Sequence, residues 1–158
     1  MRNRMYRKNS PLILLMLFLL SSCNNQTVYH SYQHISDDGW SKSDTLFFNV
    51  PLTDSTVYAY KLSVEIRNKG NYPYTDLYLF LSHNTSDSTI FVTDTLKCTL
   101  ADSEGKWQGT GLGSFYQTRI PGKDFPTLRK GNYVFKISQG MQDALLQGIN
   151  DIGIHIEK

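Results

Sequence analysis

Cys23 is the residue whose surroundings point most directly to a particular chemistry. Leu20, Ser21 and Ser22 precede it, and before them comes an unbroken apolar run of ten residues, Pro11 to Leu20. The segment ahead of that run is basic, with Arg2, Arg4, Arg7 and Lys8. The run is too short to cross a hydrocarbon core as a helix, which needs about 20 residues. Basic residues, an apolar run, small residues and then cysteine are typical of a bacterial lipoprotein signal peptide, so we expect cleavage before Cys23 and lipidation of its thiol. The alternative is a lipid-free secretory peptide followed by a chance cysteine.

Cleavage before Cys23 removes 22 of the 158 residues and leaves 136, which suits one domain with a sizeable core. We divide the chain into a signal peptide at residues 1–22, a lipidated tether at 23–27 and a domain at 28–158. Four of the 16 Lys and Arg residues leave with the signal peptide, so 12 remain against 14 Asp and Glu. No basic excess is left for binding nucleic acid. Cys98 alternates with leucines and has no partner for an intrachain disulfide, so we expect a buried thiol.

Apolar and polar residues alternate through most of the domain. The clearest case is residues 57–67, where Tyr58, Tyr60, Leu62, Val64 and Ile66 share one face. Similar or shorter apolar patterns occur at residues 28–34, 46–50, 77–81, 90–92, 96–100, 133–137 and 152–156. Turn-forming residues such as Pro121-Gly122 separate them, and only residues 141–147 favour a helix, of barely two turns. This pattern predicts an all-β fold, an antiparallel, jelly-roll-like β-sandwich of about eight strands.

Residues that could catalyse a reaction or bind a metal form no convincing pattern. His30 and His34 would share one face of a helix and could bind zinc there, but their neighbours favour a strand, in which four residues span about 13 Å. No third ligand has a suitable spacing. The glycine-rich residues 109–113 lack the Lys-Ser/Thr pair of a phosphate-binding loop. We therefore expect no enzymatic activity, no metal and no cofactor.

Trp40, Tyr72, Tyr74 and Trp107 are the candidates for contact with a protein partner or a sugar. They lie in or beside expected loops, as does Tyr116, and loops carry binding function more often than strands do. Exposed aromatic rings offer a flat apolar surface to either ligand. The favoured alternative is that the two tryptophans fill the ends of the sandwich. Rings gathered on one exposed face would support binding, whereas scattered or buried rings would support packing.

Several motifs occur in an order that is familiar from a known family. They are Gly39-Trp40, Tyr72-Pro73-Tyr74-Thr75-Asp76-Leu77, Gly105-Lys106-Trp107-Gln108-Gly109, Gly131-Asn132-Tyr133-Val134-Phe135 and Asp151-Ile152-Gly153. Together they resemble the gliding motility lipoprotein GldH family of the Bacteroidetes, over nearly all of the mature chain.

The resemblance implies an outer-membrane lipoprotein, held through Cys23, that acts as a structural or interaction component of envelope machinery. Its expected partners are other Gld-type lipoproteins or envelope proteins linked to type IX secretion. Residues 24–27 lack the acidic run that resembles surface-export signals in related lipoproteins, which favours the periplasmic side. The alternative function is carbohydrate binding through the aromatic candidates.

Overall fold

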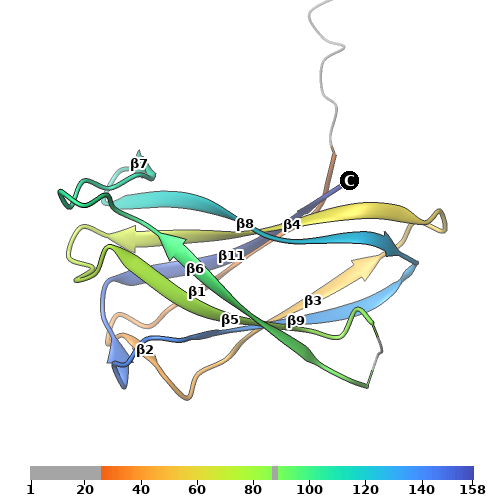
Figure 1. Ribbon diagram of the computed structural model, residues 1–158, viewed down its shortest axis with the longest axis horizontal. Coiled ribbons are helices and arrows are strands. Elements are labelled where there is room, and N and C mark those ends of the chain that lie inside the picture. The colour runs from red at the N-terminus through yellow and green to blue at the C-terminus, as the bar shows by residue number, and fades with distance from the viewer. Residues whose placement is uncertain (1–25, 87–88) are drawn as a thin grey trace, which may run out of the picture.

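The computed structural model describes residues 26–86 and 89–158, and the regular structure in these residues is entirely β-strand (Figure 1). Cys23 and the signal peptide lie outside the described residues. The long strands are β1 (Thr27–His34), β3 (Leu46–Leu52), β4 (Tyr58–Lys69), β5 (Asp76–His83), β6 (Val92–Thr99), β8 (Phe115–Leu128), β9 (Gly131–Gln139) and β11 (Ile149–Glu157). The short strands are β2 (Trp40–Ser41), β7 (Thr110–Leu112) and β10 (Leu145–Leu146). Within the described ranges, no helix has the length and apolar character needed to span a membrane.

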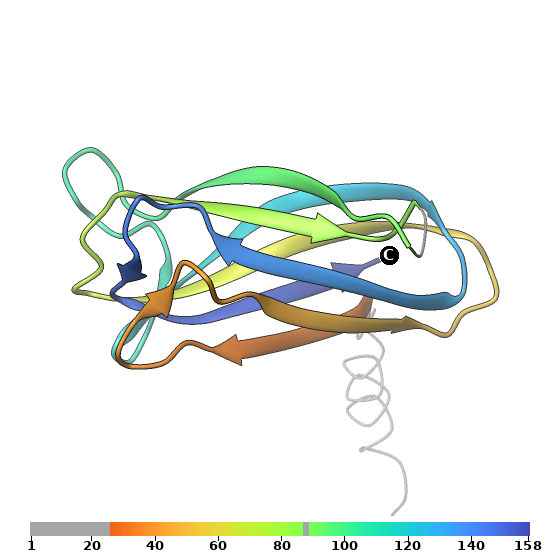
Figure 2. The ribbon, with the colours of Figure 1, turned by 90° about the horizontal axis from the view of Figure 1, so that it is seen from below.

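The strands form two layers that face each other (Figures 1 and 2). The first sheet has the order β1-β11-β4-β8-β7, the second sheet has the order β3-β9-β5-β6, and β2 pairs with β10 in a small third sheet. All pairings between these strands are antiparallel. The chain crosses between the two large sheets several times, because β3, β4 and β5 alternate between them. The predicted antiparallel sandwich is confirmed.

The core lies between the two large sheets and is built by the alternation seen in the sequence. Its inward-facing residues include Tyr60, Leu62, Val64 and Ile66 of β4, Leu77, Leu79 and Leu81 of β5, and Ile152, Ile154 and Ile156 of β11. Each aliphatic side chain buried in this way contributes about 1.5–3 kcal/mol. Cys98 is also buried and has a free thiol, so packing and backbone hydrogen bonds hold the described sheets together.

Strand β4 joins the two ends of the sandwich. Its first residue, Tyr58, pairs with Leu128, and its last residue, Lys69, pairs with Phe115. The eleven steps between the first and last of its 12 residues, at about 3.3 Å each, place these ends roughly 36 Å apart. We call the end around Tyr58 the tether end, because β1 begins there at Thr27, and the opposite end, around Lys69, the distal end.

The helix expected at residues 141–147 is wrong. The segment forms a turn and then β10, which pairs with β2. The side chain of Gln139 accepts a hydrogen bond from Met141 N and donates one to Asp143 O, both at 2.8 Å. Two turns of isolated helix are marginal in stability. Bonds to other parts of the molecule therefore decide the conformation of this segment.

The turn expected at Pro121-Gly122 is also wrong, because both residues lie inside β8. The register between β4 and β8 shifts beside them, between Leu62 and Ser63. A Cβ atom on Gly122 would lie 2.6 Å from Leu62 Cδ2, so glycine allows the two strands to approach closely. Proline and glycine mark an irregularity in a long strand here, as they often do at bulges.

Candidate functional site at the distal end

Three of the four aromatic candidates meet at the distal end. Ring centroids lie 5.8 Å apart for Tyr72 and Tyr74, and 6.4 Å apart for Tyr72 and Trp107. Tyr116, at the start of β8, extends the series with its centroid 5.6 Å from that of Trp107. These separations suit favourable aromatic pairs. We call these four side chains the ring cluster.

The ring cluster runs from the core to the surface. Tyr72 is buried and donates a hydrogen bond from its hydroxyl to Asp76 O at 2.9 Å. Burial raises the pKa of Tyr72, so its hydroxyl stays protonated. Trp107 is half-buried and packs against the core, whereas Tyr74 is 40% exposed. Tyr74 is therefore the member of this cluster that is most available to a ligand.

Trp40 is not a member of the ring cluster. Trp40 is 1% exposed, and its indole Nε1 donates a hydrogen bond to Asp44 O at 3.3 Å. Trp40 pairs with Leu146 through the β2–β10 ladder and belongs to the hydrophobic core. In this conformation the ring packs inside the sandwich and offers no surface to a partner.

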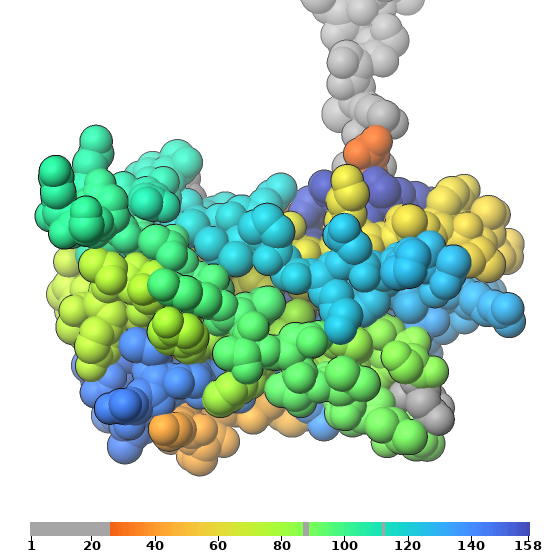
Figure 3. Space-filling model, in the orientation of Figure 1, coloured from red at the N-terminus to blue at the C-terminus, as the bar shows by residue number. Residues whose placement is uncertain are grey.

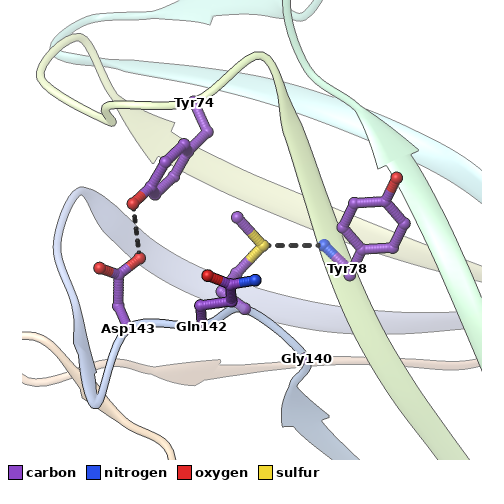
Figure 4. A pocket seen from close by; sticks show the side chains of 6 residues that line it. Tyr74, Tyr78, Gly140, Gln142 and Asp143 are labelled. Carbon is purple, nitrogen blue, oxygen red and sulfur yellow. Dashed lines mark hydrogen bonds between the residues drawn. The ribbon is translucent and has the colours of Figure 1, made fainter.

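A surface pocket of about 340 Å³ adjoins the ring cluster (Figure 4). We call it the distal pocket, and it is lined by Tyr74, Tyr78, Gly140, Met141, Gln142 and Asp143. Tyr74 donates a hydrogen bond from its hydroxyl to Asp143 Oδ2 at 2.7 Å. Tyr74 and Tyr78 both line the pocket, and the Met141 sulfur accepts a hydrogen bond from Tyr78 N at 3.4 Å. The pocket thus combines two aromatic rings and a thioether with a carboxamide and a carboxylate.

The residues around Gly140 hold this pocket in place. Gly140 N donates to Tyr78 O at 2.7 Å. A Cβ atom on Gly140 would lie 3.2 Å from Tyr78 O and 3.3 Å from the Phe80 ring, so a larger residue would crowd the strand. Gln139, which is buried, bonds through its side chain to the backbone of Met141 and of Asp143. A buried amide therefore orders the loop that carries Met141, Gln142 and Asp143.

Among the pocket residues, sequence reasoning selected Tyr74 and missed the rest. Tyr78 could have been found, because its alternation with Leu77 and Leu79 places it on the outer face of β5. Gln142 and Asp143 carried no such signal. They were expected in a helix, and their place beside Tyr74 depends on contacts between β5, β9 and the loop that follows β9.

A second polar cluster covers the outer face of the first sheet. Glu65 of β4 is fully buried there, although its alternation places it on the side away from the core. Its carboxylate accepts hydrogen bonds from Tyr32 Oη, from His30 Nε2 at 3.0 Å and from Arg119 Nε at 2.6 Å. Gly153 of β11 lies between Tyr32 and Glu65, and a Cβ atom there would come within 2.6 Å of the Tyr32 ring. The tyrosine thus crosses the glycine to reach the carboxylate.

The protonation states in this cluster favour a structural role. Burial alone would raise the pKa of Glu65, but hydrogen bonds from Tyr32, His30 and Arg119 hold it below its usual value. Burial and the bond to Glu65 raise the pKa of Tyr32 to about 12. Glu65 is therefore ionised and Tyr32 protonated at neutral pH. Both are engaged with partners of the same chain, so neither is poised for proton transfer to a substrate.

The groups considered for metal binding or nucleophilic chemistry are separated or shielded. Within the described ranges, no group of three or more metal-ligating side chains comes together. His30 bonds to Glu65, whereas His34 Nδ1 lies 3.2 Å from Asp151 Oδ1. Burial raises the pKa of the Cys98 thiol to about 12, which keeps it in its unreactive protonated form.

The fold and the site together define an antiparallel β-sandwich with an aromatic-lined surface pocket at one end. The sequence profile of the GldH lipoprotein family matches residues 27–156, and the protein belongs to this family. The gliding motility lipoprotein GldH of Flavobacterium johnsoniae is 31% identical, with 96% of this chain and 97% of that protein aligned. A gliding motility lipoprotein GldH homolog of Christiangramia forsetii is also 31% identical, over 90% of each chain. The resemblance seen in the sequence motifs is thus confirmed.

Two solved structures show more distant similarity. A family 35 carbohydrate binding module from Clostridium thermocellum aligns with 87% of this chain and 94% of its own, at 16% identity and a TM-score of 0.46. Dimeric latent PorU from Porphyromonas gingivalis aligns with 82% of this chain and 13% of its own, at 13% identity and a TM-score of 0.36. These similarities are too low to transfer a ligand or an activity.

Proposed function

We propose that this protein is a lipid-anchored cell-envelope protein that binds another envelope protein and serves gliding or the associated type IX secretion machinery. The family and the names of the two relatives support a motility lipoprotein. In this proposal residues 1–22 are a cleaved signal peptide, Cys23 carries the lipid and residues 28–158 form the binding domain. The protein is placed in the outer membrane, facing the periplasm, with no enzymatic activity.

The distal pocket is the observation that carries the binding role. Tyr74 and Tyr78 are about equally exposed, at 40% and 39%, and they line the pocket together with Met141. Tyrosine and methionine are enriched in protein interfaces, and tyrosines are frequent among the residues that dominate binding energy. The bonds to Tyr74, Met141 and Asp143 already order these side chains, so a partner would lose little further entropy on docking.

Affinity capture from native envelopes tests this role. The tagged, processed lipoprotein is compared with its Tyr74→Ala and Tyr78→Ala variants, and the retained envelope proteins are identified by mass spectrometry. Phe47→Ala is the matched control. Phe47 is an exposed ring on the outer face of the second sheet, which also contains Tyr78, and it lies outside the pocket. Each tyrosine variant should reduce capture of one defined protein by about tenfold or more, the effect of losing an interface anchor of about 1.4 kcal/mol or more. Equal capture by all variants would contradict the pocket's role.

Carbohydrate binding is the second candidate function, and the composition of the same pocket supports it. Two tyrosine rings could pack against a sugar, while the Gln142 amide and the Asp143 carboxylate could bond to its hydroxyls. The test is to titrate the soluble domain, without Cys23, with glycan strands released from peptidoglycan and to follow amide chemical shifts. Shifts confined to residues 74–78 and 140–143 that Tyr78→Ala abolishes would favour the sugar over a protein partner.

A further inference from the structure

The tether end carries exposed apolar side chains next to the point where the described chain begins. Val57 and Tyr58 are 46% and 36% exposed. Lys158 Nζ lies 4.1 Å from the Tyr58 ring centroid and 2.8 Å from Asp54 Oδ2. The backbone N of Lys158 also donates to Gln26 O at 3.0 Å. We call Val57, Tyr58 and Lys158 the tether-end patch, and Figure 3 shows the C-terminal residues and β4 beside the first described residues.

The distance to the lipid site is short. Only three residue steps separate Gln26 from Cys23. A chain reaches at most about 3.6 Å per residue, so these steps span roughly 11 Å even when fully extended. Gln26 is itself held by its bond to Lys158. A lipid on Cys23 would therefore keep the tether end within roughly 11 Å of the membrane surface.

We propose that the tether-end patch rests on the lipid surface, so that the sandwich stands end-on and its distal pocket faces away from the membrane. This inference rests on the proposed lipidation of Cys23. Tyrosine rings favour the headgroup level of a bilayer, and a lysine can lay its stem along apolar surface while its ammonium stays in water. The Lys158 ammonium already lies over the Tyr58 ring, 4.1 Å from its centroid. The interfacial zone of the bilayer is therefore a suitable environment for the patch.

Apolar contact, and not net charge, drives this association. Among the described residues, the charged side chains at the tether end include Lys61, Lys123, Arg129, Lys130 and Lys158 on one side and Asp54, Asp94, Asp124 and Glu157 on the other. Near balance of opposite charges gives little attraction to an anionic surface. The contact should therefore form on zwitterionic lipid and persist at high salt.

Fluorescence quenching by lipid tests the end-on arrangement. The processed lipoprotein is reconstituted into phosphatidylcholine vesicles that contain lipids spin-labelled near the headgroup. A fluorophore is attached at Val57→Cys and, as controls, at His34→Cys on the distal half of β1 and at Glu104→Cys at the distal end; Cys98 is buried and does not compete. The label at residue 57 should be strongly quenched in low and high salt, and those at 34 and 104 should keep their intensity.

Each other outcome identifies a different arrangement. Equal quenching at residues 57 and 34 would mean that the sandwich lies along β1, and no quenching at 57 would mean that the end stays clear of the lipid. Crosslinking between copies through residue 57 would assign the patch to a second copy. Any of these results overturns the proposal.

Tyr58→Asp should reduce quenching at residue 57 while the protein stays bound to vesicles. Failure of lipidation would be distinct, because the protein would then not float with the vesicles at all.

Discussion

Glu65 connects three strands of the first sheet through one carboxylate. It lies on β4, its donors Tyr32 and His30 lie on β1, and its donor Arg119 lies on β8. β11 separates β1 from β4 in the sheet, so the bonds from Tyr32 and His30 reach across an intervening strand. The cluster thus supplements the backbone ladder with side-chain bonds that run perpendicular to the strands.

Changing Glu65 to glutamine should lower the free energy of unfolding by about 1.5–3 kcal/mol, the range for a hydrogen bond to a charged group. The amide keeps the volume of the side chain but replaces one acceptor oxygen with a donor. Arg119 is half exposed and recovers part of the loss by binding water. Urea unfolding at pH 7 measures the effect, and the exposed Glu104→Gln should stay within about 0.5 kcal/mol of wild type. A neutral Glu65→Gln would show that the network adds no stability.

Two buried histidines should make the domain sensitive to mild acid. Burial lowers the pKa of His83 and of His155 below the usual 6.5. The unfolded chain therefore binds more protons than the folded domain once the pH falls below about 6.5, and stability declines with pH from there until the folded pKa values are passed.

The denaturation midpoint in urea, followed from pH 7.5 to 5, should therefore fall. The decline should be shallower in His155→Gln than in the wild type, because this variant lacks one of the two histidines whose pKa is lowered by burial. A flat profile over this range would refute the prediction. Loss of stability from Glu65 and Asp94 follows at lower pH, because the pKa values of both carboxyl groups are depressed.

Alternation assigned Glu65 to the outer face of β4, and that assignment was correct. It gave no sign that the carboxylate would be buried there. Burial requires Tyr32 to cross Gly153 and Arg119 to arrive from β8, and both depend on the register of strands distant in sequence. The same limit applies to Asp143 in the distal pocket, whose partner Tyr74 is 69 positions away.

Strand β4 is the element that the sequence predicts best. Its period-two pattern places Ile66 in the core, where it is fully buried. Ile66→Ala should lower the free energy of unfolding by about 2–5 kcal/mol, because the cavity adds to the loss of apolar burial. The same change at Ile90, which is 60% exposed, provides the control and should have a small effect. Similar losses for the two variants in urea unfolding would show that the assigned faces are wrong.

Short segments were harder to predict than long strands. Residues 90–92 have an apolar run, yet β6 begins at Val92 and these side chains are exposed. Residues 141–147 have a helical pattern, yet Gln139 and the β2–β10 pair hold them in another form. A segment of only a few residues has too little periodicity for its pattern to outweigh tertiary contacts. The long strands have seven or more residues each, so their alternating pattern repeats often enough to predict them.

For the whole molecule, the decisive residue under our proposal is Cys23. Cys23→Ser should leave the protein soluble in the periplasm or unprocessed, because lipidation and the associated cleavage both require the thiol. Membrane fractionation with an immunoblot measures this, and Cys98→Ser controls for the loss of a cysteine as such. Wild-type processing and membrane retention of Cys23→Ser would contradict the lipoprotein assignment.

The position of β11 between β1 and β4 has a consequence for how the chain can be delivered. Thr27 and His155, whose side chains lie 2.9 Å apart, are 128 positions apart in the sequence. Pairing over such separations forms late in folding. A chain exported from its N-terminus cannot complete the centre of its first sheet until its final strand has emerged. If the chain is exported as proposed, its translocation in an open form can therefore precede closure of the domain, because β11 has to pair with both β1 and β4.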